Sequence, residues 1–171
     1  AYVNDLVKLD PVAAAWTQLA NTPTGKSNIQ GAYLNGKSDV PGVYIGSHIT
    51  ENANYDIASN TWSTGAPLPA AQTGMTAAYN GKIYVAPEVN NRYFQIYDVA
   101  LDAWYNGADY PGDGGGEAIG AWNGKVYAVG GYYDEDQTWI YDIASNSWTS
   151  GPPTPDGYHL GGYQQVGPYL Y

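Results

Sequence analysis

The feature of this sequence that most constrains its fold is an internal repeat of roughly 44 residues. Four tryptophans each lie six residues after an aspartate. The pairs are Asp10 and Trp16, Asp56 and Trp62, Asp98 and Trp104, and Asp142 and Trp148. The tryptophans lie 46, 42 and 44 residues apart. A second marker, Asn-Gly-Lys, recurs in constant order at Asn35, Asn80 and Asn123. Two markers at one period indicate a chain built from copies of one supersecondary unit.

Each copy of the repeat reads as four short strands. Asn-Gly between two apolar runs is typical of a tight hairpin turn, since both turn positions tolerate positive φ. In residues 112–155, strands flank Asn123-Gly124, a third strand covers 138–141, and a short fourth strand carries Trp148. Four antiparallel strands in a unit of this length are typical of one blade of a β-propeller. The repeated tryptophan is then expected to pack between neighbouring blades.

The composition agrees with many short strands and excludes several classes of function. The chain has 22 Gly and 11 Pro, and its aromatic residues are 18 Tyr and 6 Trp against one Phe. Sixteen acidic residues face six basic ones, so a nucleic-acid partner is not expected. The absence of cysteine excludes disulfides, thiolate metal sites and thiol nucleophiles. No apolar run is long enough to span a membrane.

The pattern resembles the kelch repeat, whose marks are paired glycines after the second strand, a Tyr-Asp pair, and a Trp six residues later. Gly130-Gly131, Tyr141-Asp142 and Trp148 match these marks fully in one copy. Two other copies have Gly46-Ser47 and Ala86-Pro87 where the paired glycines are expected. The first full copy also reads as carrying an insertion at residues 38–42. The resemblance implies an all-β, kelch-like β-propeller with four-stranded antiparallel blades. It implies little about function, because propellers host many activities.

The phase of the repeats divides the chain into three complete blades and two halves. We interpret residues 1–171 as a single propeller region, with a half blade at 1–23, complete blades at 24–69, 70–111 and 112–155, and a half blade at 156–171. The two halves together make one blade split between the termini. Either they complete each other in a closed four-blade ring, or the chain is part of a longer or shared ring. The stop in mid-strand at Tyr171 favours the second alternative, with self-association or pairing with missing blades.

Candidate catalytic and metal sites are sparse. A copper-radical oxidase of this fold needs a cysteine and several histidines, whereas this chain has no Cys and only His48 and His159. Sialic-acid epimerases also resemble this fold, and Glu117 with His159 could supply an acid/base pair at the mouth of the central channel. Three adjacent carboxylates at residues 134–136 lack any calcium-loop spacing and read as a charged turn. We therefore expect no metal and no cofactor.

The remaining candidates lie in loops. In a propeller, the loops that join strands two to three and strands four to one emerge on one face. Tyrosine, asparagine and arginine in such loops suit recognition of proteins or sugars. The candidate binding residues are Gln72, Thr73, Asn91, Arg92, Tyr93, Glu117, Tyr132, Tyr133, Tyr158 and His159, with Asn90 in the same loop as Asn91.

Taken together, the sequence predicts a non-enzymatic binding or assembly module, extracellular or at the cell surface, that presents its loops to a protein or carbohydrate partner. One alternative is a portion of a carbohydrate-active propeller enzyme, similar to a sialic-acid epimerase. Another is a structural subunit that assembles through its blade edges.

Overall fold

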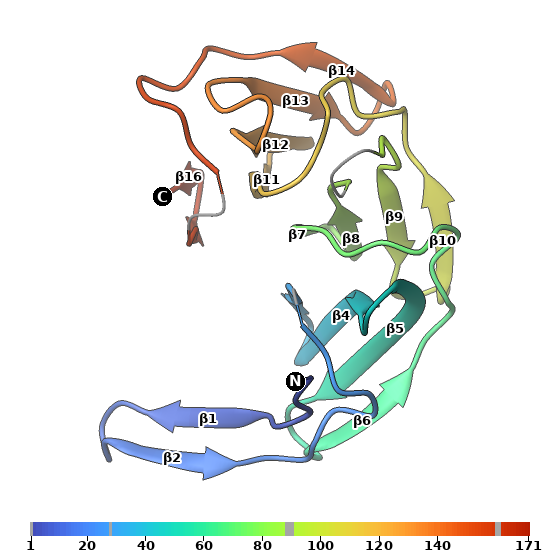
Figure 1. The fold of residues 1–171 in the computed structure, drawn as a ribbon, viewed down its shortest axis with the longest axis vertical. Helices are drawn as coiled ribbons and strands as arrows, with labels where there is room; N and C mark the ends of the chain where they lie inside the picture. Colours follow the sequence, from blue (N-terminus) through green and yellow to red (C-terminus); the bar gives the residue numbers. More distant parts are fainter. Residues whose placement is uncertain (1, 28, 88–90, 160–161) are drawn as a thin grey trace.

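The computed structural model describes residues 2–27, 29–87, 91–159 and 162–171. In these ranges the regular structure is antiparallel β-strand, arranged as three four-stranded sheets and two two-stranded sheets. Figure 1 shows the three complete blades side by side along an arc, with their first strands towards the centre and a two-stranded sheet at each end. The all-β propeller architecture predicted from the repeat is confirmed.

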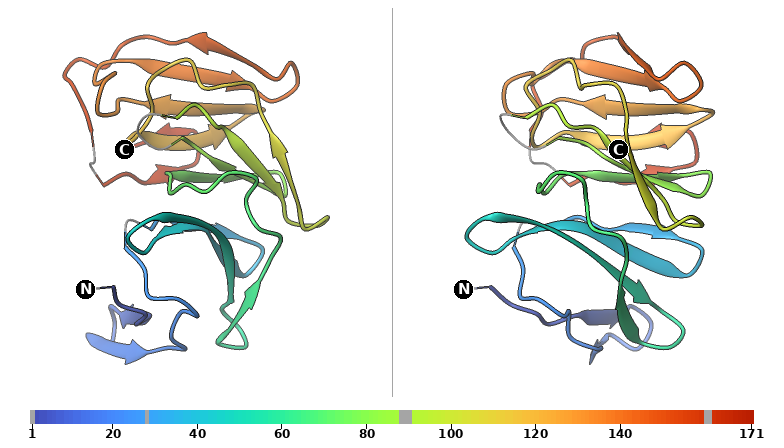
Figure 2. Two further views of the ribbon diagram at one scale, coloured as in Figure 1. Left: turned by 45° about the vertical axis from the view of Figure 1, so that its right-hand side comes forward. Right: turned by 90° about the vertical axis from the view of Figure 1, so that its right-hand side faces the viewer.

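The strands follow one order in every complete blade, from the innermost to the outermost. The first complete blade contains β3 (Ala32–Leu34), β4 (Lys37–Tyr44), β5 (His48–Asp56) and β6 (Thr61–Thr64). The second contains β7 (Thr76–Tyr79), β8 (Lys82–Val85), β9 (Gln95–Asp98) and β10 (Ala103–Asn106). The third contains β11 (Ala118–Trp122), β12 (Lys125–Val129), β13 (Thr138–Asp142) and β14 (Ser147–Ser150). The end sheets are β1 (Val7–Asp10) with β2 (Ala15–Gln18), and β15 (Gln165–Val166) with β16 (Tyr169–Leu170). Figure 2 shows the twisted blades from two further directions.

Two kinds of turn shape each blade. The Asn-Gly pairs form the expected hairpin turns, since Asn80 and Gly81 have φ of 47° and 79°, and Asn123 and Gly124 have φ of 48° and 76°. After the third strand, the repeated aspartate accepts hydrogen bonds from backbone N–H groups of the next turn. Asp142 does so from Ser145 at 2.9 Å. This bond, together with hydrogen bonds from the Lys125 side chain and the Ser145 hydroxyl, lowers the pKa of Asp142 to about 2.

Neighbouring blades are joined by a repeated arrangement that we call the clasp. At the joint between the second and third blades, Asn146 Oδ1 accepts hydrogen bonds from the Ala108 N–H (2.8 Å) and the Tyr141 hydroxyl (2.7 Å). The Trp148 indole N–H donates to the Ala108 carbonyl at 3.0 Å. Asn146 has φ of 51°, a left-handed conformation that asparagine tolerates well. The clasp therefore binds one residue of the preceding blade through both its N–H and its C=O.

The same clasp occurs at the other two joints. Its members hold the same offsets from the repeated tryptophan, and they are Tyr55, Asn60 and Trp62 around Ala20, and Tyr97, Asp102 and Trp104 around Ala66. The tryptophan of each complete blade thus packs between blades, as predicted, whereas Trp16 is 66% exposed. It also makes a hydrogen bond across the joint, which the repeat alone does not reveal.

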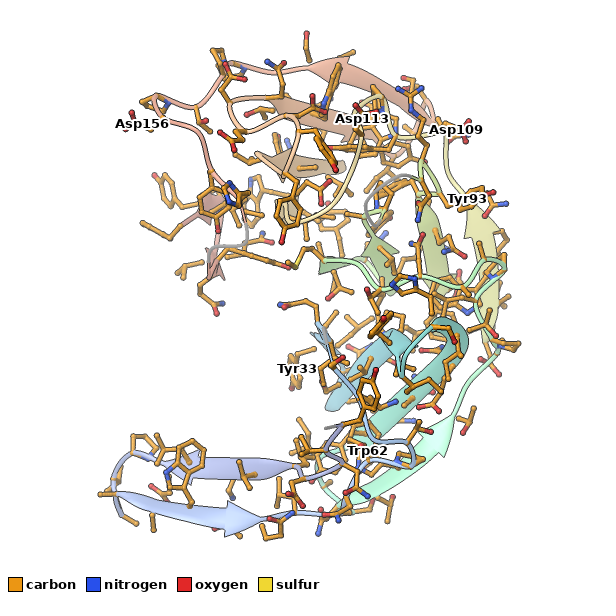
Figure 3. The ribbon with its side chains drawn as sticks, viewed as in Figure 1. Tyr33, Trp62, Tyr93, Asp109, Asp113 and Asp156 are labelled. Atoms are coloured by element: carbon orange, nitrogen blue, oxygen red, sulfur yellow. The ribbon has the colours of Figure 1, made fainter. Side chains whose placement is uncertain are left out.

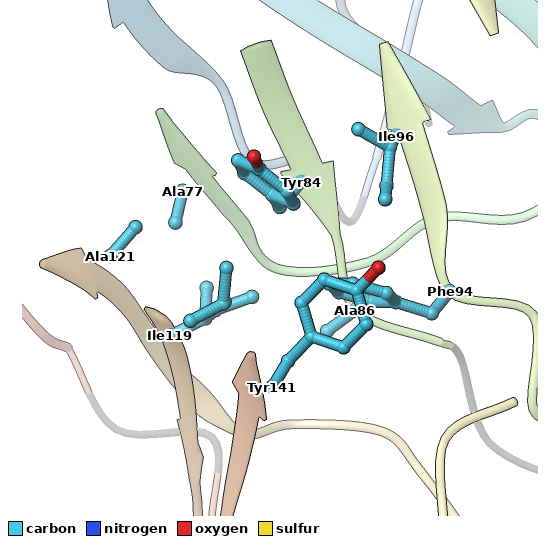
Figure 4. Packing of buried hydrophobic residues seen from close by; sticks show 9 residues of the cluster. Ala77, Tyr84, Ala86, Phe94, Ile96, Ile119, Ala121 and Tyr141 are labelled. Carbon is cyan, nitrogen blue, oxygen red and sulfur yellow. The ribbon is translucent and has the colours of Figure 1, made fainter. Parts of the chain in front are cut away.

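Apolar packing fills the joint between the second and third blades. Tyr84, Phe94 and Ile96 of the second blade lie against Ile119 and Tyr141 of the third (Figure 4). The Phe94 ring meets the Tyr141 ring edge-on, with 4.7 Å between ring centroids.

A glycine is required beside this packing. A Cβ at Gly107 would lie 2.6 Å from Phe94 Cδ1 and 3.2 Å from the Tyr141 hydroxyl. The chain between the blades therefore passes too close to these rings for a side chain to fit.

The joint between the first and second blades has a polar interior instead. Asp39, Asn52 and Asn54 are buried, and by their offsets from Asn-Gly and Trp they take the places of Tyr84, Phe94 and Ile96. Asn54 Nδ2 donates a hydrogen bond to Asp39 Oδ1. Burial of Asp39 raises the pKa of its carboxyl, while the bond from Asn54 and the charge of Lys37 act in the opposite direction.

The structure corrects the alignment of the first complete blade. The residue that corresponds to Gly130 is Gly42, which lies within β4 and has φ of 70°, close to the 71° of Gly130. A Cβ at Gly42 would lie 1.7 Å from the Gln72 carbonyl oxygen, and one at Gly130 would lie 2.2 Å from that of Tyr158. Residues 38–42 are therefore part of β4, whose register with β5 shifts between Pro41 and Val43, and the extra length lies in the long hairpin of β4 and β5. The expectation of Gly46-Ser47 at this position, and of an insertion before it, was wrong.

The two-stranded sheets lie at the two ends of the arc (Figure 1). β1 pairs only with β2, and β15 only with β16, within the described residues. In β1–β2, Leu9 lies opposite Trp16, as Tyr141 lies opposite Trp148 in the third blade. β1–β2 thus has the form of a third and fourth strand, and β15–β16 that of a first and second strand.

Candidate functional site: the rim of the second and third blades

The loops that join strands two to three and strands four to one meet on one face, which we call the rim. The Tyr110 N–H donates to the Arg92 carbonyl at 3.0 Å, so the link after β10 is bound to the loop between β8 and β9. In the third blade, the Tyr158 N–H donates to the Glu135 carbonyl at 2.8 Å. The Tyr132 N–H, in the loop after β12, donates to the Gly115 carbonyl in the link before β11 at 2.9 Å. These backbone bonds hold the loop residues in fixed positions beside one another.

Arg92 and Tyr93 form one exposed part of the rim. Arg92 is the only arginine in the sequence, and its Nη2 donates a hydrogen bond to the Pro111 carbonyl at 2.6 Å. Tyr93 is 54% exposed, and Figure 3 shows it on the same side of the arc as Asp109. Asn91 is half-buried and accepts a hydrogen bond from the Tyr93 N–H at 3.1 Å. The predicted Asn90 lies outside the described residues.

Tyr132, Tyr133 and His159 form a second exposed part. The Tyr132 ring stacks on the His159 ring, with 5.3 Å between centroids and an interplanar angle of 29°. His159 Nδ1 lies 3.3 Å from Glu135 Oε1. Tyr133 is 62% exposed, whereas Tyr158 is half-buried. The paired glycines allow this arrangement, because Gly130 and Gly131 have φ of 71° and 126° and a Cβ at Gly130 would lie 2.2 Å from the Tyr158 carbonyl oxygen.

Three of the predicted binding residues are buried beneath this surface. Gln72 and Thr73 are 1% and 4% exposed, and Gln72 Nε2 donates a hydrogen bond to the Tyr93 carbonyl at 3.3 Å. Glu117 is 1% exposed and lies under Gly131, whose Cβ would be 3.3 Å from Glu117 Cγ. Burial raises the pKa of Tyr110, and the nearby Glu117 and Asp134 raise it further. Gln72, Thr73 and Glu117 are therefore interior residues and do not contribute to the exposed surface.

Carboxylates surround the exposed aromatic residues. Six exposed or half-buried acidic side chains lie in the described rim loops of the second and third blades, and they are Asp109, Asp113, Asp134, Glu135, Asp136 and Asp156. Figure 3 places Asp113 and Asp156 on either side of the third blade. In the part of the chain that the structure describes, no three acidic or histidine side chains are grouped closely enough to hold a metal ion. The extent of this negative surface is hard to predict from the sequence, because Asp109, Asp113 and Asp156 lie apart from the other carboxylates along the chain.

A hollow lies where the first strands face the centre of the arc. It has a volume of about 530 Å³, and aromatic side chains of Tyr33, Tyr79, Trp122 and Tyr163 contribute to its wall. The Tyr163 hydroxyl donates a hydrogen bond to the Thr76 carbonyl at 3.2 Å, and burial raises the pKa of Tyr163 to about 12. Among the described residues that line this hollow, tyrosine is the only ionisable type. The wall therefore suits contact with a ligand better than acid/base chemistry.

Comparison with known proteins agrees with this architecture. A model of the kelch motif matches residues 118–155, which contain the third complete blade. The fold is similar to that in "Structure of YjhT", with a TM-score of 0.75 and 19% sequence identity over 91% of this chain. That alignment covers 62% of the YjhT chain, so this chain spans less than two thirds of its length. No curated protein matches the sequence.

The fold and the motif together define the class of protein. The chain has the kelch-type β-propeller fold, and its third complete blade is a kelch repeat. At 19% identity the likeness to YjhT establishes the fold alone. The described residues contain no helix long and apolar enough to cross a lipid bilayer.

Proposed function

We propose that this chain is a non-enzymatic binding module of the cell exterior, and that the exposed rim of its second and third blades contacts a protein or a carbohydrate. The observation that carries the proposal is the cluster of exposed aromatic side chains held in place by backbone hydrogen bonds. Tyr132 is stacked on His159, and Arg92 is fixed on the Pro111 carbonyl. Side chains that are ordered before binding lose less conformational entropy when a partner arrives.

The two classes of partner differ in how salt affects them. The rim loops of the second and third blades contain six exposed or half-buried carboxylates and one arginine, which favours a positively charged protein surface, and such attraction weakens as ionic strength rises. A neutral oligosaccharide stacked on tyrosine rings would bind with little dependence on salt. Binding should therefore be measured against an array of defined oligosaccharides and a library of displayed basic and acidic peptides, each at low and high salt.

The variants that test the rim are Arg92→Ala, Tyr132→Ala and Tyr133→Ala in combination. We expect the combined variant to lose binding to any ligand found in the screen, because exposed arginine and tyrosine dominate the energy of such interfaces. Tyr105→Ala is the matched control, since Tyr105 is also exposed (44%) but lies on β10 away from the rim loops. Unchanged binding in the combined variant, with its near-ultraviolet spectrum intact, would refute the rim as the binding surface.

A second candidate function rests on Glu117, a carboxylate that is 1% exposed beside the rim and close to Tyr110. A buried acid near a surface opening is an arrangement that carbohydrate-active enzymes use. Under this alternative, the chain is one portion of a propeller enzyme similar to a sialic-acid epimerase. Turnover of sialosides or other sugars that is lost in Glu117→Gln would support it, whereas an absence of turnover in the parent chain would leave the binding function.

A further inference from the structure

The two ends of the arc carry altered clasps, and the alterations match each other. In the three complete clasps, the acceptor is Asn60, Asp102 or Asn146, and the bound backbone belongs to an alanine. In β1–β2 the acceptor position, two residues before Trp16, is occupied by Ala14. Beyond β14 the alanine position, four residues after Trp148, is occupied by Pro152. Ala14 has no side-chain acceptor, and Pro152 has no N–H that would need one.

The remaining clasp positions of β1–β2 fit the same partner. Leu9 takes the place of the tyrosine whose hydroxyl donates to the acceptor side chain, so no hydroxyl is left without a partner opposite Ala14. Trp16 is retained, and its indole N–H can donate to the Pro152 carbonyl as Trp148 donates to that of Ala108. Three substitutions are therefore consistent with one joint between Trp16 and Pro152.

The turn of β1–β2 is otherwise unchanged. Asp10 Oδ1 accepts hydrogen bonds from the N–H groups of Val12 (2.9 Å) and Ala13 (3.0 Å), as Asp142 does in the third blade. Ala14 keeps the left-handed conformation, with φ of 50°. The end sheet therefore folds like the outer half of a blade, and the residues that differ are those that would face a preceding blade.

An apolar surface that suits this joint lies on the face of the third blade that points away from the second blade. A hollow of about 360 Å³ is lined by Ala118 and Val129, by the link of residues 154–158, and by Leu170 and Tyr171 of the end sheet. At the complete joint, the corresponding face of the second blade is covered by Tyr141 and Trp148. On β1–β2, the corresponding Leu9 and Trp16 are 47% and 66% exposed.

We propose that β1–β2 of a second copy of this chain packs against the third blade and completes the blade begun by β15–β16, so that copies join head to tail. A second copy is favoured over the same chain because β1–β2 and β15–β16 lie in separate sheets at opposite ends of the arc. The joint continues an interface that the chain already makes three times. This assembly does not depend on the binding role of the rim.

The first test uses the hydrogen-bond complementarity. Pro152→Ala introduces a backbone N–H, and Ala14 has no side-chain acceptor for it. The unsatisfied buried donor should weaken self-association by roughly fivefold or more. Ala14→Asn combined with Pro152→Ala supplies both the side-chain acceptor and the N–H of the clasp and should restore the association. Trp16→Ala should weaken it by about 30-fold or more, since a central tryptophan is a typical anchor of an interface. Leu101→Ala is the control, because Leu101 is also 66% exposed but lies in the turn of the second blade.

The second test identifies the partner directly, and it uses the absence of native cysteine. Ala14→Cys and Pro152→Cys are made in separate chains, which are then mixed under mild oxidation. The proposal predicts disulfide-linked pairs of chains in the mixture. Each variant oxidised by itself should give few linked pairs. A third chain carries both substitutions. Two outcomes would overturn the proposal: no linkage in the mixture, or a disulfide in the doubly substituted chain that forms only within that chain.

Discussion

The clasp makes a quantitative prediction about the joint between the second and third blades. Asn146→Ala removes the oxygen that accepts hydrogen bonds from Ala108 and Tyr141. Tyr141 is 2% exposed, so its hydroxyl cannot easily find water in place of the lost acceptor. Leaving one such donor unpaired costs about 1–3 kcal/mol. Alanine at φ of 51° costs about 1 kcal/mol more, because left-handed backbone disfavours a Cβ without a compensating polar group.

Asn123→Ala separates these two contributions. Asn123 also has positive φ, 48°, but it lies in an exposed hairpin turn, and its side chain makes no hydrogen bond that would be lost within the described residues. It should cost only the roughly 1 kcal/mol of the backbone term. The free energy of unfolding, measured by urea titration with tryptophan fluorescence, should therefore fall by about 1–3 kcal/mol more in Asn146→Ala than in Asn123→Ala. In thermal melts the same difference corresponds to roughly 2–12 °C in a chain of this size. Equal losses in the two variants would refute the clasp as a source of stability.

Two further predictions concern the interiors of the joints. Gly107→Ala should lower the free energy of unfolding by about 1–3 kcal/mol through overpacking against Phe94, whereas Gly162→Ala, whose Cβ would meet no atom within 4 Å, should be close to neutral in the same urea titration. Burial raises the pKa of the Asp39 carboxyl in the folded protein above its pKa in the unfolded chain. The contribution of this carboxyl to the free energy of unfolding is therefore complete below the unfolded-state pKa and is lost as pH rises through the folded-state pKa. Asp39→Asn should therefore stabilise the protein at neutral pH and give little gain near pH 3, and a gain that is the same at both pH values would contradict the burial of a charged carboxyl.

Much of the fold can be predicted from local sequence patterns. The Asn-Gly pairs locate the hairpins because two consecutive positions with positive φ restrict the residues that can occupy them. The Asp and Trp spacing locates the third turn and the fourth strand for a similar local reason. The error at Gly42 arose from the choice of Gly46, although Gly42 lies seven residues after Asn35 as Gly130 lies seven residues after Asn123, and the close approach of the Gln72 carbonyl supports Gly42.

The contacts that hold blades together are harder to predict, because they join residues far apart in sequence. Trp148 bonds to the backbone of Ala108, 40 residues away, and nothing about an alanine indicates that its backbone is bound. Burial of Gln72, Thr73 and Glu117 likewise depends on which loops fold over them. The polar interior at Asp39, Asn52 and Asn54 breaks the apolar pattern of the other blades, so its burial could not be inferred from composition. The binding role of the rim residues, and the extracellular location, stay predictions.

Head-to-tail joining can be decided by the native mass of the 171-residue protein, measured together with that of its Trp16→Ala variant. The chain has a mass of 18.3 kDa, so head-to-tail joining through Trp16 and Pro152 predicts a multiple of that mass for the parent protein. The variant should return to 18.3 kDa while keeping the β-sheet spectrum of the parent. A parent protein that remains at 18.3 kDa across micromolar concentrations, or an assembly that persists unchanged in Trp16→Ala, would contradict the proposed joint.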